Sequence, residues 1–187
     1  MAKKTAAVII ADGTEDMEFA VSVDVLRRAD IDVTIVSLEN AGTVILKTGT
    51  KVVPDTELKS ITGRSYDALV LPGGPAYKAL SKAPAVGDFL KEQEKSGRLI
   101  AAICAAPIVL STFDIGSGKK VTCYPTVKDE LNKDKYSFVN DIVAEDGNII
   151  TSQGPGTAYD FALAIVAKML GKPTAKKVAD EMLYKYE

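Results

Sequence analysis

Short apolar runs alternate with amphipathic stretches along most of the chain. Thr5–Ala11, Asp32–Leu38, Tyr66–Leu71 and Arg98–Ile103 are brief runs rich in Val, Ile, Leu and Ala, a pattern typical of strands buried on both faces. The first two runs flank Met17–Ala29, whose apolar residues recur at helical spacing. A strand, a helix and a strand in this order predict a parallel sheet.

The rest of the chain continues the alternation. Amphipathic stretches predict further helices, over Val86–Lys95, Ala105–Ser111, Thr126–Leu131 and Thr157–Leu170 and from Lys172-Pro173 onward, where Val178, Met182 and Leu183 share a face. Turn-rich segments predict shorter elements: a hairpin or a crossing strand in Asn40–Pro54, a short strand over Val121–Cys123, and a hairpin of Ile142–Ala144 with Asn148–Thr151. We therefore expect a three-layer α/β sandwich around a mainly parallel sheet.

Composition narrows the class of protein. The length of 187 residues fits one domain spanning residues 1–187. Lys plus Arg number 23 and Asp plus Glu 25, so we expect no nucleic-acid partner. Neither a membrane-spanning run nor a secretory signal is visible, and two cysteines do not form a disulfide framework. These features indicate a cytoplasmic protein with no membrane association.

The chain contains no histidine. A single chain therefore cannot build a Cys-His pair, a Ser-His-Asp triad or a zinc site with histidine ligands. Any catalytic base must be a carboxylate, a lysine, a tyrosine or a thiolate.

Three of four candidate segments fall where ligands bind in open parallel sheets, at the carboxyl ends of strands. Asp12–Glu18 follows the first predicted strand, Pro72-Gly73-Gly74 follows the third and Cys104 follows the fourth. The fourth segment, Gln153–Thr157, precedes a helix. We expect all four to meet at one rim.

Cys104 occupies a predicted strand-to-helix turn with small neighbours, as a crowded nucleophile requires. The helix N-terminus behind it would lower the thiol pKa. Gly73 and Gly74 allow the backbone to approach closely, and the N–H groups of Gly74 and Ala105 form a candidate oxyanion hole. The alternatives are a buried apolar cysteine and a simple turn.

The acidic cluster after the first strand separates into two roles. Glu15 and Asp16 are interpreted as favourable charge at a helix N-terminus. Glu18, beside a thiolate, would stay protonated and carry protons.

Two other motifs are weaker. The segment 154–157 (GPGT) is an anion cradle or, as we favour, a rigid turn, and the segment 116–120 (GSGKK) lacks the spacing of a phosphate-binding loop. Cys123 is interpreted as structural or incidentally exposed.

Taken together, the motifs resemble those of the ThiJ/PfpI superfamily and of its DJ-1-like branch. The matching segments run in order along nearly the whole chain: Glu15-Asp16-Met17-Glu18, 24–28 (DVLRR), 70–74 (VLPGG), 101–107 (AAICAAP) and 151–157 (TSQGPGT). The resemblance implies a flavodoxin-like fold, a homodimer, and no cofactor or metal.

The resemblance also implies roles for individual residues. Cys104 would be an easily oxidised nucleophile and Glu18 its protonated partner. The residues expected to bind the oxyanion or the substrate are Gly73, Gly74, Ala105, Tyr124 and Pro155.

Three positions depart from the family pattern. Ala105 stands where protease-like branches have histidine, so peptidase activity is not expected. Tyr124 replaces a histidine found in many close relatives, and a phenol is a poor base near neutral pH. Gln153 stands where many animal members have arginine, which weakens any anion pocket beside the thiol.

Three functions remain open from the sequence. The first is a cofactor-independent glyoxalase or deglycase acting on a small reactive carbonyl through Cys104. The second is a cysteine-based sensor of oxidative stress, or a redox chaperone, without significant turnover. The third is an inert scaffold in which Cys104 is merely buried.

Overall fold

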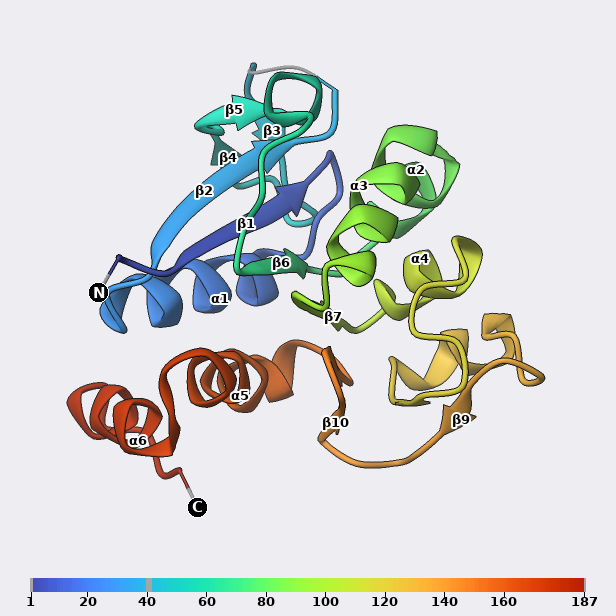
Figure 1. Ribbon diagram of the computed structural model, residues 1–187. Coiled ribbons are helices and arrows are strands. Elements are labelled where there is room, and N and C mark those ends of the chain that lie inside the picture. Colours follow the sequence, from blue (N-terminus) through green and yellow to red (C-terminus); the bar gives the residue numbers. More distant parts are fainter. Residues whose placement is uncertain (1, 40–41, 187) are drawn as a thin grey trace.

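A seven-stranded sheet forms the centre of the computed structural model, which describes residues 2–39 and 42–186 (Figure 1). The strands lie in the order β10-β11-β7-β6-β1-β2-β5, and every neighbouring pair is parallel except β10 with β11. Their bounds are β1 Thr5–Ile10, β2 Asp32–Ser37, β5 Thr56–Glu57, β6 Ala68–Leu71, β7 Leu99–Ile103, β10 Val143–Asp146 and β11 Ile149–Ser152. The expected mainly parallel sheet is confirmed.

Helices cover both faces of this sheet, so the fold has three layers. Figure 1 shows α1, α5 and α6 along one face and α2 and α3 along the other, with α4 beside α2. The bounds are α1 Asp16–Arg28, α2 Tyr77–Lys82, α3 Pro84–Lys95, α4 Pro107–Thr112, α5 Ala158–Leu170 and α6 Lys172–Glu181. This is the flavodoxin-like α/β sandwich that the sequence predicts.

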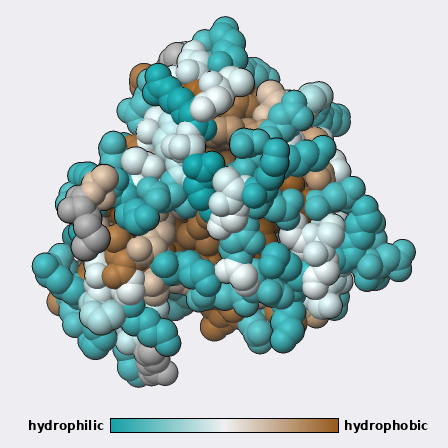
Figure 2. All heavy atoms as spheres, viewed as in Figure 1, coloured by the Kyte–Doolittle hydropathy of each residue, from teal (hydrophilic) through white to brown (hydrophobic). Residues whose placement is uncertain are grey.

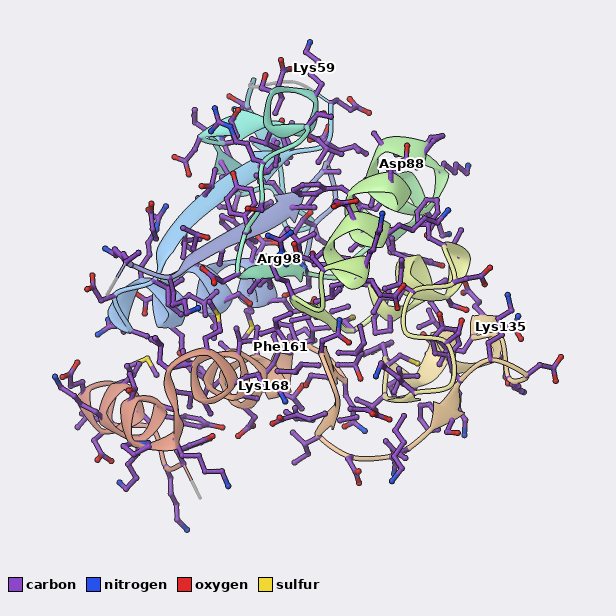
Figure 3. All side chains as sticks on the ribbon, in the orientation of Figure 1. Lys59, Asp88, Arg98, Lys135, Phe161 and Lys168 are labelled. Carbon is purple, nitrogen blue, oxygen red and sulfur yellow. The ribbon has the colours of Figure 1, made fainter. Side chains whose placement is uncertain are left out.

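The central strands are buried along their whole length because helices cover them from both sides. Every residue of β6 and β7 is buried. Phe161 of α5 is fully buried and lies between that helix and the sheet (Figure 3). The outer surface in the same view is largely hydrophilic, with apolar residues lying mostly between polar ones (Figure 2).

Several shorter strands and turns complete the fold. The strands β3 Val44–Ile45 and β4 Lys51–Val52 are antiparallel, so residues 42–54 form a hairpin and not a crossing strand. Asn40, the first residue of the predicted segment, lies outside the described residues. The second predicted hairpin is confirmed as β10 with β11. The remaining short elements are β8 Lys120–Val121, β9 Ser137–Phe138 and the 3₁₀ turns η1 Leu58–Ile61, η2 Pro125–Glu130 and η3 Pro155–Thr157.

Two expectations for individual elements are wrong. Residues 126–130 of the predicted helix Thr126–Leu131 belong to the 3₁₀ turn η2, and Leu131 follows that turn. Only Val127 of the turn is buried, and one apolar contact cannot hold a longer helix. Leu183 does not share a helix face with Val178. It lies beyond the end of α6 with a φ of 58°, and its side chain is 95% exposed.

Within the described part of the chain, no helix is both long and apolar enough to cross a membrane. The same residues contain no group of three or more Cys, Asp or Glu side chains arranged to hold a metal ion.

Candidate active site

Cys104 stands at the sharp turn between β7 and α4. Its φ is 64°, in the left-handed region that residues other than glycine seldom adopt. Two backbone hydrogen bonds hold it there: its N–H donates to the carbonyl of Ser152 at 2.9 Å, and its carbonyl accepts from the N–H of Tyr124 at 2.8 Å. Neighbouring structure therefore fixes a strained conformation, as expected of a residue kept in place for its chemistry.

The loop after β6 packs directly against this turn and must be glycine there. A Cβ atom at Gly73 would lie 2.7 Å from the Cβ of Cys104 and 2.9 Å from the nitrogen of Ala105. Gly74 has a φ of 80°, and a Cβ on it would lie 2.5 Å from the carbonyl oxygen of Gly13. The Gly73-Gly74 pair is therefore a requirement of close approach, and not only a turn after a strand.

Glu18 reaches the thiol from the first helix. Its side chain is completely buried, and its Oε2 accepts a hydrogen bond of 2.7 Å from the N–H of Gly73. Its Oε1 is buried and has no hydrogen-bond partner among the described residues, while the Cys104 thiol lies close enough to the carboxyl to lower its pKa. Glu15 caps the same helix, because its Oε2 accepts from the N–H of Glu18 at 2.9 Å.

Burial shifts the protonation of both groups in the pair. Removal from water raises the pKa of Glu18 to about 7, against the opposing hydrogen bonds from Gly73 and Cys104. Burial, together with the negative charge of Glu18, raises the pKa of the Cys104 thiol to about 12, although N–H groups of Gly74 and Ala105 bond to the sulfur and act in the other direction. The expected lowering of the thiol pKa by a helix N-terminus is therefore wrong, because burial outweighs it.

The two groups titrate together. A thiol beside a Glu18 carboxylate and a thiolate beside a Glu18 carboxylic acid hold the same number of protons. The ratio of these two forms therefore does not depend on pH. The N–H groups that bond to the Cys104 sulfur favour the thiolate form. The pair can deliver a thiolate by moving one proton from sulfur to carboxyl, without histidine.

A cavity of about 290 Å³ opens above the thiol. It brings together five of the residues singled out from the sequence: Gly74, Cys104, Ala105, Tyr124 and Pro155. Gly73 and Glu18 lie behind this lining, in contact with Cys104. The remaining lining residues are Glu15, Lys47, Pro75, Tyr77, Lys78, Thr126 and Val127.

A model of the DJ-1/PfpI family matches residues 4–168 of the chain. The chain belongs to the DJ-1/PfpI family. It is 49% identical to Protein DJ-1alpha of Drosophila melanogaster over 98% of this chain and 86% of that protein. It is 39% identical to the glutathione-independent glyoxalase DJR-1.2 of Caenorhabditis elegans over 91% of each chain. The crystal structure of Drosophila melanogaster DJ-1beta superposes with a TM-score of 0.96 at 45% identity, covering 99% of this chain and 100% of that one.

Six lining residues of this DJ-1/PfpI cavity were not singled out from the sequence, and three of them are Lys47, Tyr77 and Lys78. Lys47 comes from the loop between β3 and β4, and Tyr77 and Lys78 begin α2. The hydroxyl of Tyr77 donates to the Glu130 carboxylate at 3.1 Å, and that contact joins α2 to η2 beside the cavity. Tyr77 and Lys78 follow the Gly73-Gly74 pair closely, which was the available signal. Lys47 carried none, since its position depends on how the hairpin folds over the rim.

The other motifs of this DJ-1/PfpI chain take structural positions. The segment 154–157 forms a turn closed by Thr157, whose Oγ1 accepts from the N–H of Gly154 at 3.1 Å. Gln153 donates from its side-chain amide to Asn140 at 3.2 Å. Cys123 is a free thiol with no exposed surface, so it is buried and not incidentally exposed.

Proposed function

We propose that this protein is a glutathione-independent glyoxalase that converts methylglyoxal into lactate and glyoxal into glycolate without a cofactor. The observation that carries the proposal is the buried Glu18 carboxyl with a pKa near 7, bonded to the Cys104 thiol beneath a cavity. A group that titrates near neutral pH can both give and take a proton there. The name of the similar Caenorhabditis elegans protein supports the same reaction class.

The first step is formation of a carbon–sulfur bond. The Cys104 proton moves to Glu18, and the thiolate attacks the aldehyde carbon of methylglyoxal. The carbonyl oxygen then takes the proton back from Glu18, which leaves a hemithioacetal. The N–H groups of Gly74 and Ala105, which bond to the sulfur, are placed to stabilise negative charge on sulfur and on the new oxyanion.

The second step moves a proton between the two substrate carbons. The Glu18 carboxylate removes the hydrogen from the carbon bound to sulfur and returns it to the neighbouring carbon. The proton of the hemithioacetal hydroxyl moves to the ketone oxygen, so the former ketone becomes a hydroxyl and the carbon bound to sulfur becomes a carbonyl. The product is a lactoyl thioester on Cys104. One water molecule then hydrolyses the thioester, releases lactate and restores the Cys104–Glu18 pair, so the overall change is addition of water to methylglyoxal.

Lactate production from methylglyoxal tests this proposal. The wild type, Cys104→Ala, Glu18→Gln and Cys123→Ala are compared, and the Cys123 variant serves as the matched control because it removes the other buried thiol. We expect turnover in the wild type and the control, and at least a hundredfold loss in the other two. Equal rates in all four proteins would contradict the proposal and favour an inert scaffold.

The same thiol chemistry supports a deglycase reaction, in which Cys104 removes the carbonyl fragment from an early glycation adduct. A true deglycase consumes the adduct faster than the adduct dissociates on its own. The rate of adduct loss at saturating enzyme is therefore compared with the spontaneous dissociation rate. Equal rates would show that the enzyme acts only on free methylglyoxal.

A second candidate function is sensing of oxidative stress. The hydrogen-bond donors around the Cys104 sulfur, the N–H groups of Gly74 and Ala105, would also bind the oxygens of a sulfinate, and a protonated Glu18 would add a third donor. Intact mass after mild peroxide treatment decides this. Two added oxygens on Cys104 support the sensor, whereas oxidation confined to Cys123 would overturn it.

We also propose a cytoplasmic homodimer. Met17 of α1 and Ile45 and Val53 around the β3–β4 hairpin are large apolar side chains that are between 48% and 72% exposed. The hairpin is tied to the turn after β1, since the N–H of Ile45 donates to Asp12 at 2.8 Å. Apolar surface of this kind favours association. Sedimentation equilibrium of the wild type and of Met17→Glu tests it, and a monomeric wild type would overturn it.

A further inference from the structure

A second cavity, of about 410 Å³, lies between α3 and the segment that leads from η1 to β6. Figure 3 shows two of its residues, Asp88 on α3 and Arg98, which directly precedes β7. The lining consists of Leu58, Thr62, Gly63, Arg64, Ser65, Ala85, Asp88, Phe89, Glu92 and Arg98. None of these residues lines the Cys104 cavity, so this is a separate site.

The inner part of this cavity is apolar. Leu58 is 3% exposed, and Phe89 is half-buried and packs edge-on against Tyr66 with ring centroids 6.3 Å apart. Ala85 lies one helical turn before Phe89 and continues the same surface along α3. An apolar base of this kind would bury part of a ligand and supply most of its affinity.

The charges of the cavity are divided between its two walls. Asp88 and Glu92 are four residues apart on α3, so they lie on one face of that helix. Arg64 lies in the loop opposite. Arg98 closes the cavity from the turn before β7, where its Nε donates to Ser96 at 2.9 Å.

The two walls do not neutralise each other. Over residues 2–39 and 42–186, none of the side chains of Arg64, Asp88, Glu92 and Arg98 forms an ion pair. A carboxylate wall and a guanidinium wall thus face one volume with their charges available. Guanidinium groups favour carboxylate ligands through paired hydrogen bonds, and carboxylates favour ammonium groups.

We propose that this cavity binds a short zwitterionic peptide. The peptide's ammonium group lies at Asp88 and Glu92, its carboxylate lies at Arg64 and Arg98, and an apolar side chain rests on the surface formed by Leu58 and Phe89. The volume suits a dipeptide, because small-ligand sites usually enclose about 300 Å³ or more. This binding function goes beyond the proposed carbonyl chemistry and does not depend on it.

Titration with the dipeptide Ala-Phe, followed by amide NMR of the ¹⁵N-labelled protein, tests the proposal. We expect saturable shifts in residues 62–65 and 85–92. Acetylation of the peptide N-terminus or amidation of its C-terminus should each weaken binding at least fivefold. Arg64→Gln should weaken binding of the free peptide at least fivefold but leave the affinity for the amidated peptide unchanged. Asp88→Asn should likewise weaken binding of the free peptide at least fivefold but leave the affinity for the acetylated peptide unchanged.

Matched variants keep the test specific. Lys59→Gln removes an exposed cation that pairs with Glu57 and lies outside the cavity lining, so it should leave the affinity unchanged. Cys104→Ala should also bind Ala-Phe normally, which separates this site from the proposed reaction. Absence of saturable shifts at 10 mM peptide, or equal affinity for the doubly blocked peptide, would overturn the proposal. Thermal unfolding of each variant confirms that it is folded.

Discussion

The Glu18 carboxyl accepts a 2.7 Å hydrogen bond from the backbone N–H of Gly73, the residue whose missing side chain leaves room for Cys104. One loop therefore both holds the Glu18 carboxyl and leaves room for the Cys104 side chain. The same contact fixes Oε2 of Glu18, while Oε1 is buried with no hydrogen-bond partner in the described part of the chain. The geometry of the pair depends on backbone groups that a side-chain substitution does not remove.

The pH dependence of Cys104 alkylation should report the pair and not an isolated thiol. The pair loses its first proton at the pKa of Glu18, about 7, and the Glu18 carboxyl and the Cys104 sulfur then share the remaining proton. We expect the alkylation rate to rise through pH 7 and then level off. In Glu18→Gln this step should vanish and the rise should move to higher pH, because burial still opposes the thiolate. A step at pH 7 that persists in Glu18→Gln would contradict this assignment. The measurement uses Cys123→Ala as background.

Protein stability should fall as pH rises through the titration of Glu18. Its pKa is about 7 in the folded protein against 4.5 for the free group, so its protonated form favours folding. The contribution is complete below pH 4.5 and is lost as pH rises to about 7, with a total on the order of 3 kcal/mol. Glu18→Gln should lack this loss. Urea unfolding at pH 5 and pH 8 measures it, and equal pH dependence in both proteins would contradict the assignment.

Gly73→Ala should disrupt the site and the fold together. The added Cβ would lie 2.7 Å from the Cβ of Cys104 and from the carbonyl oxygen of Ile103, so the turn must move. We expect a loss of about 1–3 kcal/mol of stability and at least a tenfold loss of turnover. Gly156→Ala is the control, since nothing lies within 4 Å of its added Cβ. Chemical denaturation and lactate production follow both variants, and unchanged values in Gly73→Ala would show that the loop adapts.

The backbone at Cys104 should favour glycine over alanine. With a φ of 64°, a Cβ atom there costs on the order of 1 kcal/mol. Cys104→Gly should therefore be about 1 kcal/mol more stable than Cys104→Ala, although both lack the thiol. Thermal unfolding of the two variants measures the difference. A more stable alanine variant would mean that the turn relaxes once the sulfur is absent.

Much of the fold could be predicted because the main elements carry strong patterns. Strands such as Ala68–Leu71 are apolar throughout, and α5 repeats its apolar residues at helical spacing over 13 residues. The elements that escaped prediction are too short for a period to show. The helix α2 has six residues, and β5 and β9 have two each. Their positions follow from contacts made only after the sheet has formed.

The site could be predicted in its membership but not in its electrostatics. Strand ends and small residues point to Cys104, Gly73 and Gly74, and the structure brings them together around one cavity. The sequence shows a helix N-terminus near the thiol but not how deeply the thiol is buried. Burial raises its pKa, and that term depends on tertiary packing. Lys47 escaped for a similar reason, since only the folded hairpin carries it to the rim.

Cys123 has no exposed surface, whereas Cys104 lies at the bottom of an open cavity. The two thiols therefore meet a labelling reagent on different timescales. Cys104 reacts in the native state, but Cys123 must wait until the structure around it opens. The rate at which Cys123 is labelled then reports how often the structure around it opens. Compared with the rate for an exposed thiol, it gives the free energy of that opening in the unmodified sequence. The chain carries its own probe of local unfolding beside the residue proposed for its chemistry.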